Sequence, residues 1–115
     1  MPVPLYQAKA ELFRSLGHPV RIRVLELLSE RDHAVHELLA DLDIEASSLS
    51  QQLAVLRRTG LVHQQRAGGE VIYSIAVPRT RDLLQCARAL LLDMLADREH
   101  LKRELQPSAD VEAGS

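Results

Sequence analysis

The hydrophobic period of the chain changes at Gly60. Before this residue apolar side chains recur every three or four residues, as on amphipathic helices, whereas the segment LVHQQRAGGEVIYSIAV after it is typical of two strands. Gly68 and Gly69 in the middle of that segment can supply the positive φ angles that a tight hairpin turn needs. Helical spacing returns from Arg79 to about Leu105. The pattern therefore predicts a helical fold interrupted by one hairpin.

Four helices are expected before the hairpin. The first covers Leu5 to Leu16 and stops at Gly17, and the second begins at Pro19, a residue suited to the first turn of a helix. Two shorter helices follow in AVHELLADLD and EASSLSQQLAVLRRTG, joined by a tight turn. The expected fold is mainly α with a small β-hairpin wing, in the order helix, helix, helix, helix, strand, strand, helix. This is the order of a winged helix-turn-helix, whose second helix enters the major groove of DNA.

The outer face of the fourth helix is expected to carry hydrogen-bonding side chains. With Leu49, Leu53 and Leu56 directed to the core, 100° per residue places Ser, Gln and Arg side chains outward and no acid among them. Hydroxyls and amides bond base edges or phosphates, and arginines hold phosphates. A solvated helix that happens to be rich in Ser and Gln is the alternative. The predicted DNA-binding residues are Ser47, Ser48, Ser50, Gln51, Gln52, Arg57 and Arg58, together with Arg66 in the wing, which could equally be an ordinary solvent-facing arginine.

The charge of the chain is unevenly distributed. The net charge of −2 is unusual for a protein that binds the phosphate backbone, but residues 46–81 carry five basic side chains and one acidic side chain. Residues 30–45 carry six acidic side chains and one basic side chain. The basic segment coincides with the predicted recognition helix and wing. The acidic segment supports the competing hypothesis of a winged-helix module that binds only another protein.

The last helix predicts self-association. Its apolar stripe from Leu83 to Leu105 is too long for a helix at the end of so small a domain to bury alone, so a second subunit is expected to cover it. We expect one domain over residues 1–106 that forms a homodimer through the first and last helices, followed by a disordered tail over residues 107–115.

The cysteine content and the motifs that the sequence lacks indicate the cellular location and the class of protein. The chain has one cysteine, Cys86, which excludes an intrachain disulfide and leaves either a buried interfacial thiol or an intersubunit disulfide. No secretory signal or membrane span is recognisable, so a cytoplasmic location is expected. No nucleophile elbow or phosphate-binding loop is present, and an enzyme is not expected.

Two segments resemble the ArsR/SmtB family of winged-helix repressors. LGHPVRIRVLELL is similar to the family's LxDPTRxxIL, and SSLSQQLAVLRRTGLV is similar to its SxxSxHLxxLxxxGLV. His18, Val20 and Gln51 depart from the usual Asp, Thr and His. The resemblance covers the chain from about residue 12 to residue 75. It implies a DNA-binding repressor, less often an activator, that reads an inverted repeat in double-stranded DNA, with the family's contact positions at Ser47, Ser50 and Gln51 and dimerisation through the first and last helices.

The resemblance also raises the question of a metal effector, because members of the family often release DNA on metal binding. The family's cysteine site aligns Ala34 and His36 with its two cysteines, so one ligand is lost, and the usual site on the last helix is absent. Two nonstandard sets remain, with Ni or Zn as the expected ion. They are the pair His33 and His36, three residues apart at a helix start, and one face of the last helix with Asp93, Asp97, His100 and Glu104. Solvated side chains and a metal-independent regulator are the alternatives for both sets.

Overall fold

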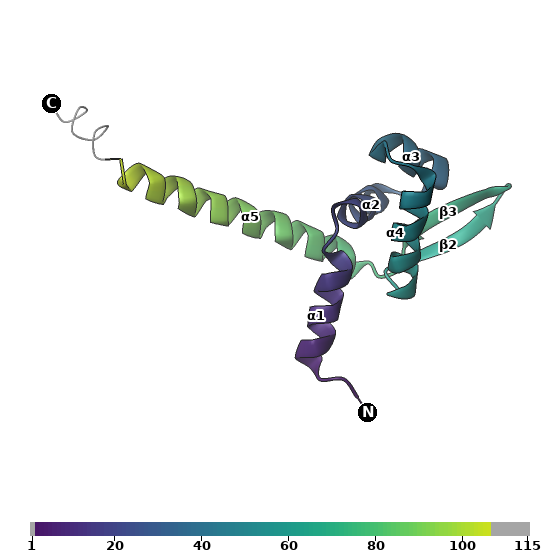
Figure 1. Ribbon diagram of the computed structural model, residues 1–115, viewed down its shortest axis with the longest axis horizontal. Coiled ribbons are helices and arrows are strands. Elements are labelled where there is room, and N and C mark those ends of the chain that lie inside the picture. Colours follow the sequence, from purple (N-terminus) through teal and green to yellow (C-terminus); the bar gives the residue numbers. More distant parts are fainter. Residues whose placement is uncertain (1, 107–115) are drawn as a thin grey trace. The chain divides into compact units, whose positions relative to one another are not determined.

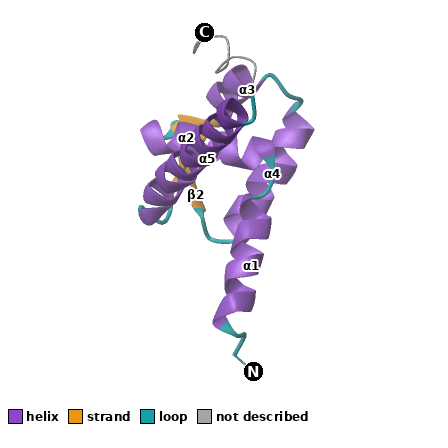
Figure 2. Ribbon diagram, turned by 90° about the vertical axis from the view of Figure 1, so that its left-hand side faces the viewer, coloured by secondary structure: helices purple, strands orange, loops and turns teal. Residues whose placement is uncertain are grey.

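The computed structural model describes residues 2–106, and the tail predicted over residues 107–115 lies outside them. The chain is mainly helical (Figure 2). Its elements are α1 (Leu5–Leu16), α2 (Pro19–Glu30), β1 (His33–Ala34), α3 (Val35–Leu42), α4 (Ala46–Arg58), β2 (Val62–Ala67), β3 (Glu70–Ile75) and α5 (Arg79–Glu104). The predicted order of helices and hairpin is confirmed (Figure 1).

The described chain forms two compact units, one that extends to Asp82 and one that begins at Leu83. The first turn of α5 belongs to the first unit, where Thr80 is buried and the Nε of Arg81 donates to the carbonyl oxygen of Ser29 at 3.0 Å. Among residues 2–106, no helix has the length and apolar character needed to cross a membrane.

The core of the first unit is built from leucines of α2, α3 and α4. Leu25, Leu28, Leu38, Leu49 and Leu56 are at most 1% exposed. Full burial of one such side chain contributes roughly 1.5–3 kcal/mol, so this cluster holds the three helices together. The residues of α4 that reach it recur at the helical spacing seen in the sequence, which leaves the opposite face of α4 outside the core.

The start of α2 has an uncommon cap. His18 lies at the N-cap with an extended backbone, and its Nδ1 accepts the N–H of Val20 at 3.1 Å, while Pro19 takes the first helical position. Ser, Thr, Asp or Asn is the usual residue at this position, because its short side chain accepts a free N–H of the first turn. The imidazole does the same work here, so His18 is a structural residue.

The sheet has three antiparallel strands in the order β1–β3–β2. Gly68 and Gly69, with φ of 58° and 81°, form the predicted two-residue turn between β2 and β3. The two strands of the predicted hairpin are confirmed, and the sequence analysis missed the third strand, β1, in which His33 and Ala34 pair with Tyr73 and Ile72 of β3. A two-residue strand shows no period in the sequence, and only its backbone pairing with β3 defines it.

Candidate nucleic-acid interface

The exposed face of α4 is polar, as predicted. Ser47, Ser48, Ser50 and Gln51 are exposed in its first turns. Glu45 at the N-cap makes no side-chain capping bond, so the backbone N–H groups of the first turn keep their capacity to donate. Hydroxyls beside free N–H groups at a positive helix end suit a phosphate oxygen, and the side chains further along suit base edges.

Gln52 differs from its neighbour Gln51. Gln52 is half-buried, and its Oε1 accepts from the Nε of Arg21 at 2.9 Å. The same guanidinium donates from Nη1 to the carbonyl oxygen of Ser15 at 2.8 Å. Arg21 of α2 therefore links the end of α1 to α4. It occupies the acceptor oxygen of Gln52, a residue that the sequence analysis predicted to bind DNA.

The end of α4 is linked to the wing through Gln64. Arg57 and Gln64 are both exposed, and the Nη1 of Arg57 donates to the Oε1 of Gln64. The hydroxyl of Tyr73, a buried residue directly opposite Gln64 in the β2–β3 pairing, donates to the same oxygen at 3.0 Å. The sequence analysis missed Gln64, because its role depends on the strand register and on the approach of α4.

Two arginines of the predicted set make no side-chain hydrogen bond or ion pair within residues 2–106. Arg58 is exposed in the last turn of α4, and Arg66 is exposed near the tip of β2. Side chains two residues apart on a strand share a face, so Arg66 lies on the same face of the wing as Gln64. Both guanidiniums can therefore donate to a phosphate oxygen without breaking an internal contact.

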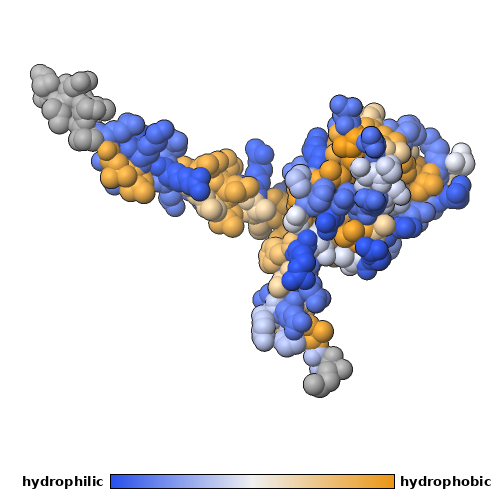
Figure 3. All heavy atoms as spheres, viewed as in Figure 1, coloured by the Kyte–Doolittle hydropathy of each residue, from blue (hydrophilic) through white to orange (hydrophobic). Residues whose placement is uncertain are grey.

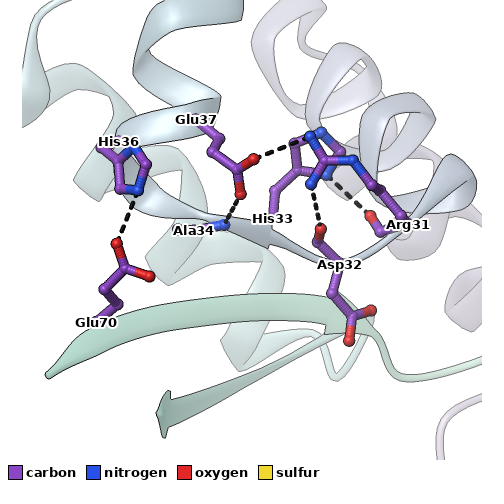
Figure 4. A network of polar contacts seen from close by, with 7 residues as sticks. All are labelled: Arg31, Asp32, His33, Ala34, His36, Glu37 and Glu70. Atoms are coloured by element: carbon purple, nitrogen blue, oxygen red, sulfur yellow. Dashed lines mark hydrogen bonds and ion pairs between the residues drawn. The ribbon is translucent and has the colours of Figure 1, made fainter. Parts of the chain in front are cut away.

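His33 and His36 do not form the predicted pair. His33 lies in β1 and is 2% exposed, and its Nδ1 donates to the carbonyl oxygen of Arg31 at 2.9 Å. His36 is exposed in the first turn of α3, and its Nε2 contacts Oε1 of Glu70 at 2.8 Å. Figure 4 shows the two rings on opposite sides of Glu37. The placement of both at one helix start is wrong, because pairing with β3 draws His33 into the sheet.

Glu37 stabilises the start of α3. Its Oε2 accepts from Arg31 at 2.9 Å and its Oε1 accepts the N–H of Ala34, the N-cap residue, at 2.9 Å (Figure 4). The hydrogen bond from Arg31, followed by the backbone bond, lowers the pKa of this carboxyl from 4.5 to about 2. The lowered pKa of Glu37 is therefore explained first by its hydrogen bond with Arg31 and then by the helix cap, so this part of the acidic segment is structural.

The acidic face of α5 is continuous in the structure. Asp93, Asp97, His100 and Glu104 fall on one side of an unbroken helix, and His100 Nε2 lies 3.1 Å from Oε1 of Glu104. Both side chains of that pair are exposed. Nowhere in the described part of a single chain do three or more His, Cys, Asp or Glu side chains gather closely enough to hold a metal ion.

Large apolar side chains of α1 and α5 are exposed. The apolar side chains form orange patches along α5 in Figure 3. Cys86 of α5 is also exposed in the single chain. The exposed apolar residues of the two helices are Leu5, Tyr6, Leu12, Phe13, Leu90, Leu91, Leu92, Met94, Leu95 and Leu101, and the exposed Leu105 directly follows α5.

The helices α3 and α4 are followed by the glycine-tipped hairpin of β2 and β3, and the exposed face of α4 is polar. This order defines a winged helix-turn-helix protein of the DNA-binding class. The sequence model of the arsR family of bacterial regulatory proteins matches residues 18–64. The chain belongs to the arsR family. It is a transcriptional regulator and not an enzyme, as the sequence predicted.

Relatives of known sequence support this assignment over most of the chain. The chain is 53% identical over 104 residues to Rv0081, a helix-turn-helix-type transcriptional regulator of Mycobacterium tuberculosis, covering 90% of this chain and 91% of that protein. It is 33% identical over 94 residues to the biofilm growth-associated repressor of Agrobacterium fabrum, covering 78% of this chain and 80% of the relative.

Solved structures agree with the fold. The crystal structure of Rv0081 matches with a TM-score of 0.78 and 55% identity, covering 84% of this chain and 98% of that one. The homodimeric winged helix-turn-helix DNA-binding domain of Mb0332 from Mycobacterium bovis matches with a TM-score of 0.63 and 27% identity, covering 86% of each chain.

Proposed function

We propose that the chain is a homodimeric repressor that reads an inverted repeat in duplex DNA, with one α4 helix in the major groove of each half-site. The observation that carries the proposal is the acid-free polar face of α4 beside a wing that bears a free arginine. Major-groove readout needs this combination of base-reading amides and hydroxyls with flanking cations that hold the backbone.

The contacts divide by the chemistry of the side chains. Ser50 and Gln51 face base edges, and Ser47 and Ser48 place hydroxyls beside the N–H groups of the first turn for a phosphate. The three arginines Arg57, Arg58 and Arg66 contact the backbone, the last of them from the wing. Gln52 holds α4 in place through Arg21, a supporting role rather than a base-reading one.

The dimer is proposed from the uncovered apolar side chains of α1 and α5. Tyr6 is 78% exposed, Phe13 is 59% exposed and Leu91 is 58% exposed, and burial of one large apolar side chain contributes roughly 1.5–3 kcal/mol. The Mb0332 domain, which is homodimeric, supports the proposal of a homodimer. A two-fold dimer presents two identical α4 helices, and their targets on DNA form an inverted repeat.

A response to Ni or Zn is the finer part of the proposal, and it rests on α5. Asp93, Asp97, His100 and Glu104 share a face of that helix, and imidazole and carboxylate suit these ions. One described chain does not supply three clustered donors, so the site requires donors from both subunits. The buried ring of His33 removes the other histidine set from the proposal.

The metal response is tested by calorimetric titration of the apo dimer with Ni and with Zn. We expect the variant Asp97→Ala/His100→Ala to lose binding and the control His63→Ala, a solvent-exposed histidine of β2, to keep it. Binding weaker than about micromolar in the wild type removes metal sensing from the proposal.

DNA binding is tested by gel retardation of the duplex upstream of the protein's own coding sequence, at several salt concentrations. We expect a shift for the wild type that Gln51→Ala and Arg58→Ala weaken and Gln65→Ala does not. Absence of a shift at low salt contradicts the proposal. It favours the competing hypothesis, a module that binds another protein through the acidic segment of residues 30–45.

A further inference from the structure

Gln64 accepts two hydrogen bonds on one oxygen at the junction of α4 and the wing. The donors are Nη1 of Arg57, from the last turn of α4, and the hydroxyl of Tyr73, from β3. Gln64 and Tyr73 are a directly opposed cross-strand pair, and Tyr73 is only 6% exposed. A buried tyrosine therefore fixes the oxygen that Arg57 uses.

The orientation of the Gln64 amide follows from its partners. A guanidinium has donors and no acceptor, so only the oxygen of Gln64 can face Arg57. Within the described residues, the Nε2 of Gln64 makes no hydrogen bond, and neither do the other side-chain nitrogens of Arg57. The Arg57 side chain is thus anchored by one of its N–H groups while four of its five remain able to donate.

We propose that Gln64 is a positioning residue for DNA binding, which holds the Arg57 guanidinium against the wing and presets its remaining N–H groups for a phosphate oxygen of the DNA backbone. The proposal rests on the proposed function, because it takes α4 and the wing as the DNA-binding surface. An exposed arginine on a helix end otherwise loses much rotamer freedom when it binds, and anchoring beforehand lowers that cost.

The arrangement also joins the two elements that contact DNA. Arg57 belongs to α4 and Gln64 to β2, so the hydrogen bond between them links the groove-reading helix to the wing. Arg58 makes no such contact within the described residues, which makes it the natural comparison. We therefore expect Gln64 to act through Arg57 alone.

The test is a double-mutant cycle on the full chain. The probes are the duplex upstream of the protein's own coding sequence and a random duplex of the same length. The variants are Gln64→Ala, Arg57→Ala and the double variant, with Tyr73→Phe as a second way to loosen the amide. The matched control is Gln65→Ala, which removes the adjacent exposed glutamine of the same strand. Thermal unfolding of each variant verifies that the fold is retained.

We expect Gln64→Ala to weaken binding to both duplexes about 3- to 10-fold in the wild-type background and less than about 2-fold in the Arg57→Ala background. Tyr73→Phe follows the same pattern with a smaller loss, and Gln65→Ala has no effect. An equal loss in both backgrounds, or no loss in either, overturns the proposal while DNA binding by the wild type stands. A wild type that retards neither duplex instead refutes the proposed function itself.

Discussion

The Nε of Arg21 donates to Oε1 of Gln52 at 2.9 Å, so one of the two adjacent glutamines of α4 is held against α2 while Gln51 faces solvent. Two neighbours of identical chemistry therefore have different tasks. The contrast is directly testable, because the same substitution at either position removes the same atoms.

Gln51→Ala should lower affinity for the operator by about 1–3 kcal/mol, roughly 5- to 150-fold, and leave thermal stability unchanged, because an exposed base-reading amide is lost. Gln52→Ala should instead lower the free energy of unfolding by about 0.5–1.5 kcal/mol, because Arg21 loses an acceptor. Fluorescence anisotropy on operator and random duplexes, together with thermal melts, separates the two effects. An equal loss of sequence discrimination in both variants would contradict this division.

Arg58→Ala and Arg66→Ala should each reduce the slope of log K against log salt by about 0.9 per protomer, because each removes one phosphate contact. Arg58→Lys should keep the slope, since the charge is retained. Arg23→Ala is the control, because Arg23 lies on α2 and pairs with Glu26 at 3.3 Å. An unchanged slope for either variant means that this arginine only faces solvent.

His18→Ala should destabilise the protein by about 0.5–2 kcal/mol, because the N–H of Val20 loses its cap. His18→Asp should be at least as stable as the wild type at neutral pH, since a carboxylate both accepts this bond and interacts favourably with the helix dipole. Urea denaturation of the three proteins measures the difference. Equal stability of His18→Ala and the wild type would show that the cap contributes nothing.

The stabilising contribution of Glu37 should depend on pH. Its pKa falls from 4.5 to about 2 on folding, so the carboxylate contributes stability above 4.5 that is lost as the pH falls toward about 2. The difference in unfolding free energy between wild type and Glu37→Gln should therefore be largest near neutral pH and shrink on acidification. Asp41→Asn, an exposed carboxylate of the same helix, should give a smaller difference in urea melts, and a constant difference for Glu37→Gln would contradict the assignment.

Leu91→Glu should shift the protein from dimer to monomer and abolish retardation of the operator at concentrations where the wild type is dimeric. A buried, unpaired carboxylate in an apolar interface is strongly unfavourable. Ala96→Glu is the control, because at 100° per residue it lies on the opposite side of α5. Size-exclusion chromatography with light scattering gives the mass, and a dimeric Leu91→Glu would place the interface elsewhere.

Much of the fold was predictable because it depends on local periodicity. Leu49, Leu53 and Leu56 define the buried side of α4 from their spacing, and the same spacing leaves Ser50 and Gln51 outside. The glycine pair of the hairpin was equally readable, because few other residues adopt positive φ at consecutive positions. These features follow from a residue and its near neighbours in the chain.

The candidate site was less predictable wherever it depends on contacts between distant segments. His33 looked like the start of a helix, but its pairing with Tyr73 places it in the sheet. Gln64 carried no signal, because its partners Arg57 and Tyr73 meet it only after the wing folds back on α4. The expected histidine pair failed for the same reason.

The sequence by itself determined the helices, the hairpin and the polar face of α4, because the hydrophobic period and the glycine positions act over a few residues. Only the tertiary structure decided which polar side chains of that face are free and which are occupied. Arg21 reaches Gln52 across 31 positions, and Glu70 reaches His36 across 34. Hydrogen bonds between residues so far apart in the sequence form only when hydrophobic burial brings their elements together, and no local sequence pattern predicts them.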